Sequence, residues 1–255
     1  MSEQAKKRPV VVVTGGSRDI GAAVCRLAAA AGYDVVVNYR TEEEAARRVV
    51  ESCRQAGAAA VAVAGDMSAE ADIVALFDRA EAEFGPISHV VNNAGITGKS
   101  SPLADCPAEV IRAAIDVNVT GAILVAREAA RRLSTRRGGK GGSIVNISSV
   151  ASEIGSPNEY VWYAASKGAI DSLTLGLSKE LAPDGIRVNS VAPGMTMTDI
   201  HERSTEDAGR LERIRPNIPM QRIGEPEEIA AAVLFMMSDG ASYTSGATLK
   251  VAGGR

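Results

Sequence analysis

The segment VVVVTGGSRDIG at residues 10–21 joins four consecutive valines to a glycine-rich turn. An unbroken run of β-branched residues is typical of a strand that is covered on both faces. The turn, followed by a helix expected at about residues 20–31, directs unpaired backbone N–H groups and the positive end of a helix dipole at one point. Gly15 allows a tight turn and Gly21 allows the helix to pack closely on the strand. The segment therefore predicts an anion site suited to a dinucleotide pyrophosphate.

Six more short apolar runs follow, and helical patterns separate them. They cover residues 34–39, 60–64, 87–92, 142–148, 186–192 and 247–252. The sequence therefore predicts seven strands in a parallel sheet with helices on both sides. Thr41 and Glu44 have the spacing of a capping box ahead of a helix to about residue 55, and Pro107 and Pro226 stand where first-turn prolines belong.

The chain has 255 residues, of which 45% are hydrophobic, and this length suits one domain with a substantial core. We expect a flexible tail at residues 1–8 and a single domain at 9–255. Residues 195–219 interrupt the alternation with polar and charged residues and two prolines. We interpret them as a lid over the mouth of the site.

Composition excludes several classes of function. The net charge of −3, with both signs interspersed, argues against nucleic-acid binding. The three cysteines show neither disulfide nor zinc-site spacing, so we expect no metal and a reducing, cytoplasmic location. No apolar stretch approaches the length of a membrane span, and we expect no membrane partner.

Further motifs accompany the glycine turn: N-N-A-G at 92–95, Asn118, Ser149, Y-A-A-S-K at 163–167 and P-G at 193–194. In this order and at these separations they resemble the classical short-chain dehydrogenase/reductase family, from about Val10 to the C-terminus, especially its bacterial 3-oxoacyl reductase-like and glucose dehydrogenase-like members. The resemblance implies an α/β, single-domain, doubly wound Rossmann fold. It also implies a homo-oligomer, a tetramer or a dimer, built through helices at about 107–134 and 160–181.

Tyr163 and Lys167 lie four residues apart in a helical stretch, so both project from one face. An adjacent ammonium favours the phenolate and lowers the pKa of the phenol from about 10. Such a pair is usually surface decoration, but Ser149 after a strand favours catalysis. The resemblance then implies that Tyr163 is the general acid/base, Lys167 lowers its pKa and binds the nicotinamide ribose, Ser149 hydrogen-bonds the substrate oxygen, and Asn118 holds a water in a proton relay.

The dinucleotide preference depends on the end of the second strand. No acid stands there to accept hydrogen bonds from the ribose of NAD, whereas Arg18 and Arg40 suit the 2′-phosphate of NADP. The sequence predicts NADP(H), with NAD(H) as the alternative. Arg40 facing water and Asp66 capping the next helix are the competing interpretations for these two residues. The expected cofactor contacts are Gly15, Ser17, Arg18, Asp19, Ile20, Gly21, Asn38, Tyr39, Arg40, Asp66, Met67, Asn93, Ala94, Gly95, Tyr163, Lys167, Pro193, Gly194, Thr196 and Thr198.

Asp19 departs from the family turn T-G-x-x-x-G-x-G, because it replaces the middle glycine. A carboxylate there repels a pyrophosphate unless its side chain points away or Ser17 and Arg18 compensate. The leading hypothesis is an NADP(H)-dependent enzyme that interconverts a ketone and a secondary alcohol. The alternatives are an NAD(H)-dependent sugar or polyol dehydrogenase and a cofactor-binding regulatory protein with little turnover. A 3-oxoacyl thioester, a sugar and a small cyclic ketone all remain candidate substrates.

Overall fold

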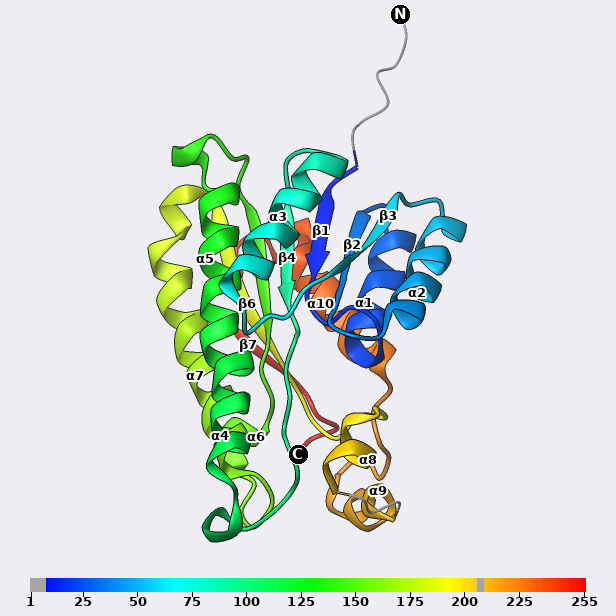
Figure 1. The fold of residues 1–255 in the computed structure, drawn as a ribbon, viewed down its shortest axis with the longest axis vertical. Coiled ribbons are helices and arrows are strands. Elements are labelled where there is room, and N and C mark those ends of the chain that lie inside the picture. The colour runs from blue at the N-terminus through cyan, green and yellow to red at the C-terminus, as the bar shows by residue number, and fades with distance from the viewer. Residues whose placement is uncertain (1–7, 206–208) are drawn as a thin grey trace, which may run out of the picture.

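A computed structural model describes residues 8–205 and 209–255, so the predicted tail lies, except for Arg8, outside the described residues. Seven parallel strands form one sheet in the order β3-β2-β1-β4-β5-β6-β7 (Figure 1). The doubly wound fold is therefore confirmed. The strands are β1 Val10–Val13, β2 Asp34–Tyr39, β3 Ala60–Ala64, β4 His89–Asn92, β5 Gly142–Ile147, β6 Ile186–Pro193 and β7 Thr248–Val251.

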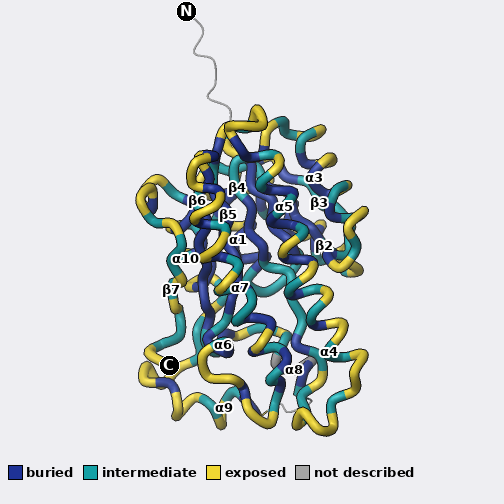
Figure 2. Tube along the Cα trace, turned by 90° about the vertical axis from the view of Figure 1, so that its left-hand side faces the viewer, coloured by how far each residue is buried: buried dark blue, intermediate teal, exposed yellow. Residues whose placement is uncertain are grey.

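Helices cover both faces of the sheet, and alternate strand residues pack against each layer. Val11 and Val13 belong to the core under α1, α2 and α10, while Val10 and Val12 belong to the core under α3, α5 and α7. Figure 2 shows the strands as a buried centre with exposed residues toward the outside. The helix bounds are α1 Asp19–Ala30, α2 Glu43–Gln55, α3 Glu70–Phe84, α4 Ala108–Ile115, α5 Ala122–Leu133, α6 Ala151–Ile154, α7 Val161–Glu180 and α10 Pro226–Met237.

The start of α2 differs from the sequence-based expectation. The helix begins at Glu43, its N-cap residue is Glu42, and no side chain caps it, so the capping box predicted at Thr41 and Glu44 is wrong. The chain turns one residue later than the motif requires, and the Glu42 carboxylate pairs with Arg18 instead of the helix backbone. Here an ion pair between distant segments forms, and the local capping bonds do not.

The two prolines mark helix starts. Pro226 is the first residue of α10, as expected, and a reciprocal capping box between Glu225 and Glu228 supports it. Pro107 immediately precedes α4 as its N-cap residue, one position earlier than expected. At its other end α4 continues into α5 through a π-helical segment, Asp116–Gly121.

The described residues of 195–219, the predicted lid segment, lie beyond the carboxyl ends of the strands. They include α8 (Ile200–Thr205) and α9 (Arg210–Ile214), which hang below the sheet in gold and orange in Figure 1. An isolated parallel β-bridge between Thr196 and Gly224 anchors the start of this segment. Within the described ranges, no helix combines the length and apolarity needed to cross a membrane.

Candidate active site

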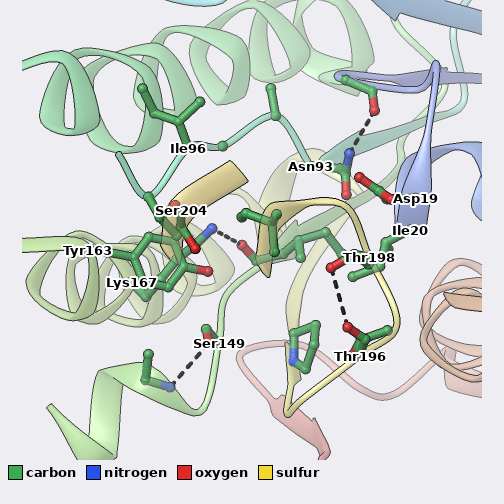
Figure 3. A pocket seen from close by; sticks show the side chains of 18 of the residues that line it. Asp19, Ile20, Asn93, Ile96, Ser149, Tyr163, Lys167, Thr196, Thr198 and Ser204 are labelled. Carbon is green, nitrogen blue, oxygen red and sulfur yellow. Dashed lines mark hydrogen bonds between the residues drawn. The ribbon is translucent and has the colours of Figure 1, made fainter. Parts of the chain in front are cut away.

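A cavity of about 850 Å³ runs from the glycine turn to the lid at the carboxyl ends of the strands. This is the size of ordinary small-molecule and cofactor sites, about 300–1,000 Å³. Every residue expected to contact the cofactor lines the cavity, and so does Ser149. Figure 3 shows Ser149, Tyr163 and Lys167 among the lining residues. Among the predicted site residues, Asn118 is the one that does not line it. No cluster of metal-ligating side chains occurs in the part of the chain that the structure describes.

Asn38 holds the glycine turn in place from β2. Its Oδ1 accepts a hydrogen bond of 3.0 Å from the Gly15 N–H, and its Nδ2 donates to the carbonyls of Val63 (3.3 Å) and Gly65 (3.1 Å). The side chain is buried. Backbone groups use both the oxygen and the nitrogen of its side-chain amide. Asn38 therefore holds the shape of the predicted cofactor end of the cavity.

Thr14 joins the glycine turn to the N-N-A-G segment. Its Oγ1 accepts hydrogen bonds from the N–H groups of Asn93 (2.9 Å) and Ala94 (3.0 Å). In return, Asn93 Nδ2 donates to the carbonyls of Thr14 (2.9 Å) and Gly15 (3.1 Å). These reciprocal bonds hold the two motifs together. Thr14 was not among the residues predicted to form the site.

Asp19 occupies a glycine-like conformation, with φ at +50°, where an L-residue other than asparagine or aspartate is disfavoured. Its Oδ1 accepts a hydrogen bond of 3.1 Å from the backbone N–H of Asp199 in the lid. Its Oδ2 lies 3.6 Å from Arg18 Nε. The carboxylate thus engages the lid and an arginine, which offsets the repulsion that Asp19 alone exerts on a pyrophosphate.

Acidic side chains already pair with both arginines expected at the cofactor ribose. Arg18 Nη1 lies 2.8 Å from Glu42 Oε1, and Arg40 Nη1 lies 3.8 Å from Asp66 Oδ2. All four residues line the cavity. Nothing in the sequence pointed to Glu42, because the acid that pairs with an NAD ribose is expected at the end of β2, whereas Glu42 stands three residues beyond it, next to the predicted start of a helix.

The predicted catalytic side chains Ser149, Tyr163 and Lys167 meet on one wall of the cavity. Lys167 Nζ lies 5.6 Å from the centre of the Tyr163 ring and donates a 2.7 Å hydrogen bond to the Ile147 carbonyl. Desolvation raises the pKa of Tyr163 to about 12, against a hydrogen bond with Ser149 that lowers it. Desolvation also lowers the pKa of Lys167 to about 8. Burial therefore outweighs the ammonium that we expected to lower the pKa of Tyr163, and the phenol keeps its proton at neutral pH.

Asn118 lies behind this wall, in the π-helical segment. Its Oδ1 accepts from the Ile96 N–H at 2.8 Å, and its Nδ2 donates to the Ile96 carbonyl at 2.8 Å and to Ser166 Oγ at 3.0 Å. Single π-helical turns are frequent at functional sites. Asn118 thus fixes the loop after β4 against α7, and its role in a water relay stays a prediction.

We expect Lys167→Met to stabilise the fold near neutral pH by up to about 3 kcal/mol, the cost of holding a lysine whose pKa falls from 10.5 to about 8. The unfolded chain keeps the ordinary pKa, so the folded state binds fewer protons between pH 8 and about 10.5, and wild-type stability rises with pH there. The advantage of the variant should shrink over that window.

Urea unfolding at pH 7 and pH 10 measures this difference. Lys179→Met is the matched control, because Lys179 is exposed on the same helix. If the extra stability of Lys167→Met did not change with pH, burying the charge of Lys167 would not destabilise the fold.

Comparison with known proteins identifies the family. The model of a family described as enoyl-(acyl carrier protein) reductase matches residues 15–255. The chain is 48% identical to an uncharacterized oxidoreductase of Escherichia coli strain K12, covering 96% of this chain and 99% of the relative. It is 42% identical to 3beta-hydroxysteroid dehydrogenase 1 of Eggerthella lenta (97% and 94% covered) and 38% identical to glucose 1-dehydrogenase 2 of Bacillus subtilis (95% and 93% covered).

Solved structures agree with this assignment. A 3-ketoacyl-(acyl-carrier-protein) reductase from Brucella melitensis, complexed with NADH, superposes with a TM-score of 0.89 at 33% identity, covering 97% of this chain and 98% of that one. A short-chain dehydrogenase from Burkholderia cenocepacia in complex with NADP gives a TM-score of 0.88 at 33% identity, covering 99% of each chain. The chain therefore belongs to the short-chain dehydrogenase/reductase family and is an NAD(P)-dependent oxidoreductase.

Proposed function

We propose that the protein is an NADP(H)-dependent oxidoreductase that interconverts a ketone and a secondary alcohol. The observation that carries the proposal is that Ser149, Tyr163 and Lys167 line the same cavity as the glycine turn. A bound nicotinamide supplies or accepts the hydride. The glycine turn, the N-N-A-G segment and the lid threonines are the residues that would hold the dinucleotide.

The side chains of this protein manage the substrate oxygen and its proton. As hydride reaches the carbonyl carbon, negative charge develops on that oxygen, which needs a hydrogen bond and then a proton. The Ser149 hydroxyl donates the hydrogen bond and the neutral Tyr163 phenol donates the proton. Lys167, fixed by the Ile147 carbonyl, places its ammonium beside the phenolate that remains.

Arg18 and Arg40 support a preference for NADP(H), because both line the expected ribose end of the cavity. Glu42 favours the alternative, an NAD(H)-dependent sugar or polyol dehydrogenase. Its carboxylate occupies Arg18 and stands where it can accept hydrogen bonds from a ribose. The balance between these charges decides which dinucleotide binds more tightly.

Fluorescence titration with NADPH and NADH tests the proposal, with wild type compared with Glu42→Gln. We expect wild type to bind NADPH more tightly, and the variant to bind NADPH about tenfold more tightly still, because Arg18 is released to the 2′-phosphate. NADH affinity should change by less. Glu43→Gln is the control, because Glu43 pairs with Arg47 on the surface. Binding of neither dinucleotide by wild type would overturn the proposed function.

We further propose a homo-oligomer, a tetramer or a dimer. Large apolar side chains stay exposed on the central helices, including Ile123 on α5, Leu175 on α7 and Phe235 on α10.

The cysteines of the chain are all free thiols, which supports a cytoplasmic location.

A further inference from the structure

Arg210 is a buried guanidinium in the lid that the proposed reaction does not use. It opens α9, is only 4% exposed and lines the cavity. Its Nη2 donates to Glu159 Oε2 at 2.7 Å and to the Tyr160 hydroxyl. Its Cζ lies 5.2 Å from the centre of the Tyr160 ring, so the cation also rests on an aromatic face.

The other nitrogens of this guanidinium have no acceptor. Nε and Nη1 are buried and make no hydrogen bond, which leaves three of the five N–H groups of an arginine unsatisfied. A buried cationic donor without a partner is costly, and buried arginines are normally paired fully. This arrangement indicates a site that a ligand group completes.

Arg210 lies close to the reacting centre. The Tyr160 ring packs edge-on against the Tyr163 ring, with centres 5.7 Å apart. Together with the 5.2 Å separation above, this places Arg210 Cζ at most about 11 Å from the centre of the Tyr163 ring. One small molecule can therefore touch both residues, provided that the group at Arg210 is several bonds from the reacting carbon.

The charges of the described lining residues outside the predicted cofactor end favour an anion. Apart from Lys167 and the charged residues assigned above to the cofactor end, the charged side chains among the described lining residues are the cations Lys99, Arg210 and Arg255 and the anion Glu159. Glu159 is 39% exposed, so water screens its charge more than that of the buried guanidinium. Among these described side chains, the cations outnumber the carboxylate.

We propose that Arg210 binds a carboxylate of the substrate, so that the preferred substrates are oxo acids, and the matching hydroxy acids, whose carboxylate lies several bonds from the reacting carbon. A guanidinium and a carboxylate make strong charge-assisted hydrogen bonds. The substrate carboxylate accepts from Nε and Nη1, the donors without a partner, while Glu159, bonded to Nη2, competes for the same cation. The inference rests on the proposed function, because it assumes that the cavity reduces a ketone.

The test compares oxo acids with their neutral amides as substrates for reduction. Suitable pairs are 4-oxopentanoate, 5-oxohexanoate and 4-oxocyclohexanecarboxylate, each with its carboxamide. For wild type we expect kcat/KM to be about 10- to 100-fold higher for the acid in at least one pair, as one or two hydrogen bonds to charged groups supply. Arg210→Met should abolish this ratio and leave the rate with the amide within about threefold.

Two further variants separate a specificity role from a structural one. Arg210→Lys keeps the charge and should keep part of the preference for the acid. Glu159→Gln removes the competing carboxylate and should raise that preference, even if Arg210→Met proves unstable. An acid-to-amide ratio near one in wild type, or one that Arg210→Met and Glu159→Gln leave unchanged, overturns this inference alone. Reduction of neither member of any pair, nor of any neutral ketone, overturns the proposed function as well.

Discussion

Tyr163→Phe is expected to lower kcat/KM for ketone reduction by about 10²- to 10⁴-fold, the usual contribution of a positioned general acid. The phenol lines the cavity beside Lys167, and its pKa of about 12 keeps the proton that the product oxygen needs. Removing one oxygen leaves the ring contact with Tyr160 in place. Steady-state kinetics with NADPH measure the loss, and fluorescence titration should show a cofactor Kd within about twofold of wild type.

The same variant separates an enzyme from a regulatory protein. Tyr160→Phe is the matched control, because the Tyr160 hydroxyl bonds Arg210 and touches no reacting group in the proposed reaction. Tyr160→Phe should therefore lose far less activity. Equal activity of Tyr163→Phe and wild type would remove Tyr163 from the chemistry. Tight cofactor binding by wild type without turnover of any ketone would favour the regulatory alternative.

The sheet could be predicted from the sequence because its signals are local. Val10–Val13, Asp34–Tyr39 and Ala60–Ala64 form strands with the expected boundaries, since runs of β-branched and small apolar residues suit the strands of a parallel sheet. The predicted fourth strand begins two residues early, at residue 87 instead of His89. Ile87 is buried like a strand residue, and periodicity cannot separate such a residue from the strand that it precedes.

Only the parts of the site that short sequence motifs encode could be predicted. The glycine turn and the Tyr163–Lys167 pair are short-range patterns, and the fold brings them to one cavity. The partners of Asp19 and Arg18 were invisible, because Asp199 stands 180 residues from Asp19 and Glu42 stands 24 residues from Arg18. Such pairings depend on which loops meet above the sheet, and no local pattern encodes them.

Gly21→Ala should damage both stability and cofactor binding. A Cβ at residue 21 would lie 2.2 Å from the Gly15 carbonyl oxygen and 2.7 Å from Asn93 Nδ2, so α1 must move away from the turn. Overpacking of this kind typically lowers the free energy of unfolding by about 1–3 kcal/mol. Because the displaced backbone N–H groups are those predicted to face the pyrophosphate, we expect affinity for NADPH to fall more than about tenfold.

Gly176→Ala is the matched control, since a Cβ there meets nothing within 4 Å and the residue lies inside α7, far along the chain from the turn. It should leave cofactor affinity unchanged and stabilise the fold by up to about 1 kcal/mol through helix propensity. Urea unfolding and NADPH titration on both variants measure the contrast. If Gly21→Ala lost stability but bound NADPH as tightly as wild type, the anion would not lie on the N-terminus of α1, and the glycine turn would serve only to pack the helix on the sheet.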